Sequence, residues 1–333
     1  MTTLASVKVK CAVCGYFSWH STLGSFYSGN RIGFDLQPVA PNLSCDVQYC
    51  PVCHYCAPSI GEVVDSRSLL ESDQEISIDI DEILKSLEED GSSELLFSKE
   101  ILNLVKNAQG IVFKENLTDV DSDSFVQKYL DLSRFFRKNS KAKLLLHESD
   151  KKKLTDILES DEYKLLAEAI DKTTGEGLRG FCLCYSILYS YICEKFNWFS
   201  EAGWYSLCCA KSCYDYLWQR CFKKDETIKP RLRALRFFMK TILSGESFYR
   251  DIVDEGLILI ELSRRTGKFE VARQLLNSLE EAITIYGYEL GLIQKRLLQC
   301  QKYLIERRDS SEYIIDSNGS VFDSRKKKVN LAF

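Results

Sequence analysis

The spacing of apolar residues divides the chain into parts with different predicted secondary structure. In residues 151–308, apolar side chains recur at intervals of three and four, which is typical of amphipathic helices. This stretch contains a single proline, Pro230, and its pattern breaks at positions such as Asn197 and Gly267. Residues 1–60 hold short apolar pieces separated by Gly, Pro, Asn and Ser, which predicts short strands and turns. The predicted fold class is therefore mainly α, with a small β region at the N-terminus.

Two further parts of the chain lack a strong periodic pattern. Residues 61–150 include an acidic stretch, Glu71 to Glu94, with ten acidic residues against the single Lys85. We interpret residues 61–150 as an acidic, partly ordered insertion. Residues 309–333 are polar and basic, and we expect them to form a frayed tail.

Composition and charge narrow the class of protein. The 333 residues carry a formal net charge of −4, so no overall basicity draws the chain to nucleic acid. No run of about 18 apolar residues occurs, which predicts no membrane span. The N-terminal residues lack the apolar core of a signal peptide. Fourteen cysteines without an export signal indicate a reducing compartment, so we expect a cytoplasmic protein in which clustered thiols bind metal or pack in the core.

Four of these cysteines have the spacing of a metal site. Cys11 and Cys14 form one C-x2-C pair, Cys50 and Cys53 form a second, and 35 residues separate the pairs. A two-residue gap lets both thiolates of one turn reach the same ion, and two such knuckles complete a tetrahedral site with Zn–S distances of about 2.3 Å. The sequence therefore predicts one structural Zn²⁺ per chain, held in a zinc ribbon formed by residues 1–60.

The ligand set has alternatives, because Cys45, His54 and Cys56 lie close to the second pair. Cys53 and Cys56 themselves form a C-x2-C, so a shifted pairing would also satisfy the spacing. Seven more cysteines lie between residues 182 and 221 among aromatic and aliphatic residues. We interpret those seven as small buried side chains that pack in the core.

The second knuckle carries a resemblance to a known family. The run from Cys50 to Ala57, CPVCHYCA, resembles the CPxCGYAA knuckle of an uncharacterised bacterial family of unknown function. It departs from that pattern at His54, where the family prefers Gly, and at Cys56, where it prefers Ala. The resemblance covers residues 1–60 and roughly 180–290. It implies an N-terminal zinc ribbon followed by tetratricopeptide-like helices, and it implies no activity.

The helical part also contains two similar segments. Leu259, Gly267, Phe269 and Ala272 follow the order of a tetratricopeptide unit, and Tyr189, Asn197, Phe199 and Ala202 repeat it more weakly. Ala202 and Ala272 lie 70 positions apart, about two periods of 34 residues. Residues 151–308 are therefore predicted to form a tetratricopeptide-like helical domain, with a helical bundle without true repeats as the alternative.

These features favour a non-catalytic interaction or scaffold protein whose helical surface binds a protein or peptide. The candidate binding residues are the aromatic side chains of the helical part: Tyr189, Trp204, Tyr205 and Trp218.

Nucleic-acid binding is the alternative function, in which either the zinc ribbon or the Arg231–Lys240 helix contacts phosphates. The stretch Arg231–Lys240 is basic and contains aromatic residues, and Arg233 and Arg236 are its candidate phosphate contacts. An enzyme with an unrecognised site is a third hypothesis. The run 175–180 matches GxGxxG, but it follows a predicted helix rather than a strand, so we interpret it as a loop.

Overall fold

The computed structural model describes residues 3–25, 31–36, 47–68, 99–113, 122–132, 138–139, 148–175, 183–212, 228–249, 251–323 and 327–329. Helices make up most of the described chain, and strands concentrate near its two ends. The predicted fold class, mainly α with a small N-terminal β region, is confirmed.

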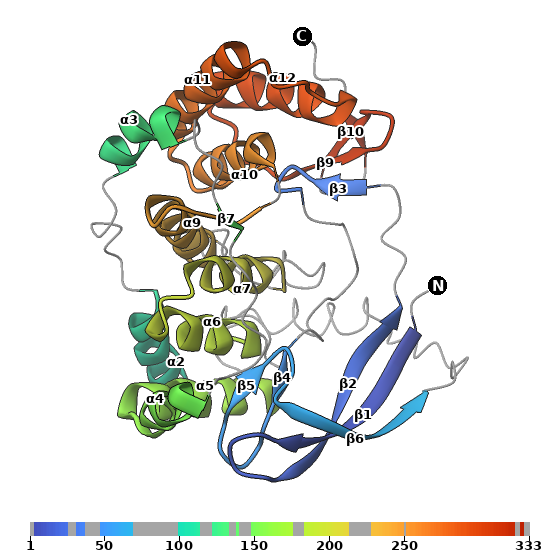
Figure 1. Cartoon of the computed structure of the whole chain (residues 1–333), viewed down its shortest axis with the longest axis vertical. Helices are drawn as coiled ribbons and strands as arrows, with labels where there is room; N and C mark the ends of the chain where they lie inside the picture. Colours follow the sequence, from blue (N-terminus) through green and yellow to red (C-terminus); the bar gives the residue numbers. More distant parts are fainter. Residues whose placement is uncertain are drawn as a thin grey trace.

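The main body is an array of helices that stack in chain order (Figure 1). Each helix buries its apolar stripe against the next one, because residues spaced three and four apart share one face. The buried side chains form two clusters, one toward each end of the array. The array consists of α4 (Glu148–Glu159), α5 (Asp161–Gly175), α6 (Tyr185–Lys195), α7 (Phe199–Ser212), α9 (Ile228–Leu243), α10 (Ile252–Arg265), α11 (Phe269–Tyr286) and α12 (Leu292–Glu306).

The helix pairs α6/α7 and α10/α11 are joined by turns of the same geometry. Asn197 and Gly267, 70 positions apart, both have positive φ, 59° and 76°. Around them, four backbone hydrogen bonds recur with every donor and acceptor shifted by 70 positions. In the first turn these run from the amides of Phe196, Asn197, Trp198 and Ala202 to the carbonyls of Ile192, Glu194, Cys193 and Trp198. The equal turns agree with the predicted pair of similar segments, whereas their assignment as tetratricopeptide units stays a prediction.

The N-terminal sheet contains three antiparallel strands in the order β2-β1-β6. These are β1 (Thr3–Cys11), β2 (Phe17–Ser25) and β6 (Gly61–Ser68). Because side chains alternate along a strand, Val7, Val9 and Cys11 of β1 share one face, and all three are buried. The sheet extends past the predicted boundary at residue 60, since β6 pairs with β1 along most of its length.

A second sheet joins distant parts of the chain. Its order is β11-β10-β9-β3, formed by β3 (Arg31–Gly33), β9 (Tyr313–Asp316), β10 (Val321–Asp323) and β11 (Lys328–Val329). The prediction of a frayed tail is therefore wrong for residues 313–323, which are held by strand pairing. The prediction treated polarity as a sign of fraying, but the apolar residues Ile315 and Val321 are buried.

A buried charged cluster ties this C-terminal segment to α10. Arg264 is fully buried and pairs with Glu261 at 2.7 Å. Its guanidinium also donates to the carbonyl oxygens of Asp309 and Ser311, and to Gln301 Oε1 at 3.1 Å. The cluster thereby fixes the start of the C-terminal strands against two helices.

Parts of residues 61–150 also belong to the helical body. Here α2 (Lys99–Val112) packs on α5, α3 (Ser122–Leu132) packs on α11, and β7 (Lys138–Asn139) pairs with β8 (Glu246–Ser247). The acidic stretch from Glu71 to Glu94 lies outside the described residues.

Candidate metal centre

The first knuckle is a tight turn that follows β1. The amide of Gly15 donates to the Cys11 carbonyl at 2.9 Å, and the amide of Cys11 donates to the Tyr16 carbonyl at 2.8 Å. Gly15 has φ of 73°, in the left-handed region that glycine adopts without steric cost. The turn therefore explains why a glycine directly follows the second cysteine of the pair.

The second knuckle has the same backbone hydrogen bonds. It is flanked by β4 (Gln48–Tyr49) and β5 (Cys56–Ala57), which pair with each other. The amide of His54 donates to the Cys50 carbonyl at 2.9 Å, and the amide of Cys50 donates to the Tyr55 carbonyl at 2.8 Å. His54 stands where the first knuckle has Gly15, and it adopts φ of 59° despite its side chain. Such a conformation is unfavourable for a residue other than glycine, so contacts of His54 must compensate for it.

The two knuckles bring four sulfurs together. The Sγ atoms of Cys11, Cys14, Cys50 and Cys53 all lie within 4.8 Å of one another. Across the knuckles, Cys11 Sγ lies 3.7 Å from Cys53 Sγ, and Cys14 Sγ lies 3.5 Å from Cys50 Sγ. These are the four residues whose spacing predicted a metal site, and their sulfurs are close enough to hold one metal ion.

The electrostatics of the cluster favour a cation at its centre. The hydrogen bond between the Cys11 and Cys53 sulfurs lowers the pKa of Cys11 to about 5 and raises the pKa of Cys53. Burial is the largest influence on Cys50 and raises its pKa. The protein alone thus stabilises the negative charge of the Cys11 sulfur but not that of the Cys50 and Cys53 sulfurs. A divalent ion would offset the repulsion among four thiolates and release their protons.

The alternative ligands have other contacts. Cys56 is buried, and its Sγ lies 3.8 Å from Tyr163 Oη and 3.9 Å from the Tyr185 carbonyl. The His54 ring faces Tyr49 and Asp171. Within the described part of the chain, the group with metal-binding geometry contains neither residue. Cys45 lies outside that part.

The second knuckle docks directly on the helical array. The Tyr49 ring stacks on Tyr185 of α6 with centroids 4.4 Å apart, and the Tyr49 hydroxyl donates to Asp171 Oδ2 of α5 at 2.8 Å. His54 Nδ1 hydrogen-bonds the same hydroxyl and lies 3.5 Å from Asp171 Oδ2. From α5, the Tyr163 hydroxyl donates to the His54 carbonyl at 2.6 Å. These contacts hold His54 in its left-handed conformation.

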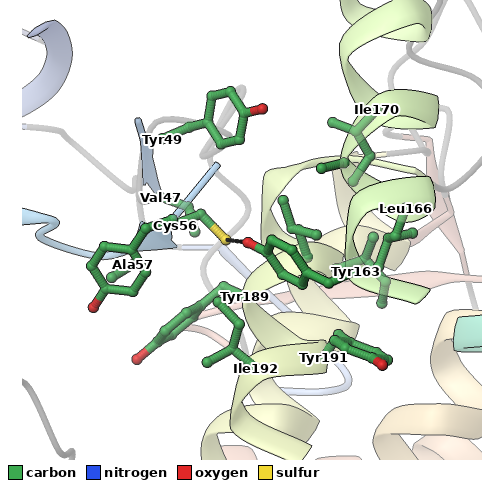
Figure 2. Close-up of a cluster of buried hydrophobic side chains, with 14 of the residues drawn as sticks. Val47, Tyr49, Cys56, Ala57, Tyr163, Leu166, Ile170, Tyr189, Tyr191 and Ile192 are labelled. Carbon is green, nitrogen blue, oxygen red and sulfur yellow. Dashed lines mark hydrogen bonds between the residues drawn. The ribbon is translucent and has the colours of Figure 1, made fainter. Parts of the chain in front are cut away.

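Figure 2 shows the apolar side of this junction, where Val47 and the β5 residues Cys56 and Ala57 face Tyr163, Leu166 and Ile170 of α5. Tyr189 and Ile192 of α6 belong to the same buried cluster. The metal centre and the end of the array that contains α5 and α6 therefore share one hydrophobic core. The sequence did not predict the roles of Asp171 and Tyr163. Each lies 109 or more positions from its knuckle partner, and nothing in the neighbouring sequence indicates a contact over that distance.

The aromatic candidates of the helical part belong largely to the core. Tyr189 is 5% exposed, so the expectation that it lines an open binding surface is wrong. Trp204 Nε1 donates to the Phe248 carbonyl at 3.1 Å, and its ring packs edge-on against Phe238. Tyr205 is half-buried and packs edge-on against Tyr189. Trp218 lies outside the described residues.

The basic candidates on α9 also point inward. Arg233 is 5% exposed, pairs with Glu194 Oε2 at 2.7 Å and donates to the Val112 carbonyl at 2.7 Å. Arg236 pairs with the other oxygen of Glu194 at 2.9 Å. The prediction that these arginines present their charge to phosphates is therefore wrong. A pattern of basic residues along a helix does not show which of them will pair with a carboxylate of another helix.

Comparison with protein-family models, with curated proteins and with solved structures gives no match. The family resemblance of the second knuckle therefore stays a prediction. Among the described helices, none combines the length and apolar character that crossing a membrane requires.

Proposed function

We propose that Cys11, Cys14, Cys50 and Cys53 hold one Zn²⁺ as a structural ion. The observation that carries this proposal is the group of four sulfurs within 4.8 Å of one another, supplied by two turns with the same hydrogen bonds. Zn²⁺ accepts four thiolates in a tetrahedral arrangement, and four protein ligands leave no coordination position for a substrate. The ion would thus organise the chain and take no part in a reaction.

Native mass spectrometry of the full chain tests the ion. One zinc per chain is the expected result, and it should be lost when Cys14 is replaced by Ser. Iron also binds four thiolates tetrahedrally, so a mass and a visible absorption spectrum that indicate iron would contradict the choice of metal. Metal-free protein with an ordered N-terminal sheet would contradict the site itself.

We propose further that the protein is a non-catalytic, cytoplasmic scaffold in which the metal centre supports a helical array that binds a protein or peptide. The support is the shared core: the second knuckle packs on α5 and α6, so its ion stabilises the array as well as the ribbon. Helical arrays offer extended surfaces for protein partners. At the α11–α12 end, Ile285 and Leu292 are 53% and 65% exposed and are candidates for such contacts.

A stoichiometric partner tests this role. Native mass spectrometry after gentle purification should retain a second protein, and replacement of both Ile285 and Leu292 by Asp should release it with metal content unchanged. Purification of the intact chain with no bound protein or peptide, under conditions that preserve the metal, would refute the scaffold role.

A further inference from the structure

The outer face of the N-terminal sheet carries exposed aromatic side chains next to lysines. In β2, Phe17 and Trp19 are 48% and 42% exposed. They stand directly opposite Lys10 and Lys8 of β1, the central strand. Because alternate residues share a face, these four side chains lie on the side opposite buried Val7 and Val9. We call Lys8, Lys10, Phe17 and Trp19 the aromatic–lysine face.

The two lysines converge on one ring. Lys8 Nζ lies 5.7 Å and Lys10 Nζ lies 5.8 Å from the centroid of the Phe17 ring. Both ammonium groups therefore lean toward the aromatic strand. On the other side of β1, Glu62 and Asp65 of β6 stand opposite Lys10 and Lys8 and are exposed. The face is thus divided, with rings and cations over β2 and β1 and carboxylates over β6.

We propose that the aromatic–lysine face binds single-stranded nucleic acid. Exposed rings offer stacking surfaces for any base, and ammonium groups beside the rings match the negative charge of the phosphates. Phe17 and Trp19 are two residues apart on one strand, which separates their Cα atoms by about 6.8 Å. That is twice the ~3.4 Å spacing of stacked bases in a duplex strand, so the rings suit two bases that are no longer stacked on each other.

The same features disfavour a duplex and a protein at this face. Two lysines contact few phosphates, and stacking on rings requires bases that are unpaired. The cores of protein–protein interfaces are depleted of charged residues, whereas here the lysines occupy the central strand. This inference goes beyond the proposed scaffold role and uses a different surface.

The test is fluorescence anisotropy of the full, zinc-loaded chain with labelled oligo(dT) and oligo(U) of about 12 nucleotides. Two phosphate contacts predict a slope of about −1.4 in log affinity against log salt, or an affinity loss of about sevenfold between ~50 and ~200 mM salt. Phe17→Ala should weaken binding by about 5- to 150-fold, since one stacked base is lost. Lys8→Gln with Lys10→Gln should weaken binding and flatten the salt dependence.

Two controls separate this proposal from loss of folding and from the scaffold role. Glu62→Gln with Asp65→Asn should tighten binding, because the repulsion between carboxylates and phosphates is removed, and a damaged fold cannot produce that gain. Leu292→Ser, at the far end of the array, should leave oligonucleotide binding unchanged. Absence of binding at ~50 mM salt, or binding that Phe17→Ala leaves intact, would overturn the proposal. So would a protein ligand whose binding requires Phe17.

Discussion

The contact between Tyr163 and the second knuckle offers a direct measure of how strongly the array supports the metal centre. Tyr163 is fully buried, and its hydroxyl donates to the His54 carbonyl at 2.6 Å and lies 3.8 Å from Cys56 Sγ. Tyr163→Phe removes this hydroxyl and leaves the ring in place. Loss of a buried hydrogen-bond partner costs about 1–3 kcal/mol of folding free energy.

The same change should reach the metal. If the knuckle holds its geometry only when docked on α5, the lost free energy also appears as weaker metal binding. About 1–3 kcal/mol of coupling corresponds to about a 5- to 150-fold rise in the dissociation constant of zinc. Competition with a chelator of known affinity measures that constant, and denaturant unfolding measures stability.

Tyr191→Phe is the matched control. Tyr191 is also a buried tyrosine of the lower core, but its hydroxyl donates to Glu162 Oε2 at 2.6 Å and makes no contact with a knuckle in the described residues. Both variants should lose stability, and Tyr163→Phe alone should weaken zinc binding. Equal zinc affinity in the two variants would refute the reasoning that the array positions the ligands.

Three further changes test other parts of the structure. Cys50→Ser should abolish metal binding and lower the melting temperature of the helices as well as that of the ribbon, because the two share a core. The control Cys300→Ser should keep the metal. Elemental analysis measures the metal content, and circular dichroism measures the melting temperature. Arg264→Met removes the cationic partner of the buried Glu261 carboxylate, which keeps its hydrogen bond from Gln301 Nε2. This loss costs about 3–5 kcal/mol, against less than ~1 kcal/mol for the exposed Arg273→Met. Hydrogen exchange should then rise in residues 313–323 of the Arg264 variant and stay unchanged there in the Arg273 variant. Burial raises the pKa of Asp309, but hydrogen bonds from Ser311 and Tyr313 outweigh burial and lower it from its ordinary 3.8. The folded state therefore gains stability from ionised Asp309 above pH 3.8 and loses this stability as the pH falls further. Asp309→Asn should remove this part of the pH dependence of the unfolding free energy, measured by urea titration at several acidic pH values. An unchanged pH dependence in the variant would contradict this prediction.

The local features of this chain could be predicted from sequence because short-range chemistry determines them. A C-x2-C pair followed by a turn residue specifies a knuckle by itself, so Cys11, Cys14, Cys50 and Cys53 were identifiable as a group. Asn197 and Gly267 were likewise recognisable as helix ends, since few residues tolerate positive φ.

The features that the sequence did not predict all depend on contacts between residues that are distant along the chain. Nothing in the spacing of Arg31–Gly33 indicates that it pairs with a strand near residue 315. The direction in which Arg233 points depends on Glu194, a residue of another helix, and a charge pattern along α9 contains no information about it. Polarity also misled the interpretation of the tail, because short strands need few apolar residues when one of them enters an existing core.

Because of the segment between the two knuckles, the chain cannot be cut into a separate ribbon and a separate helical part. Its ends lie at the four sulfurs, and its middle, Arg31–Gly33 with buried Phe34, is paired with the C-terminal strands at the opposite end of the array (Figure 1). Removing the N-terminal 68 residues would therefore take away more than a ribbon: the sheet at the far end would lose its β3 strand, and the second core would lose an aromatic ring. We therefore expect the ribbon and the helices to fold as one unit. Neither part should fold when it is produced alone or fused to another protein.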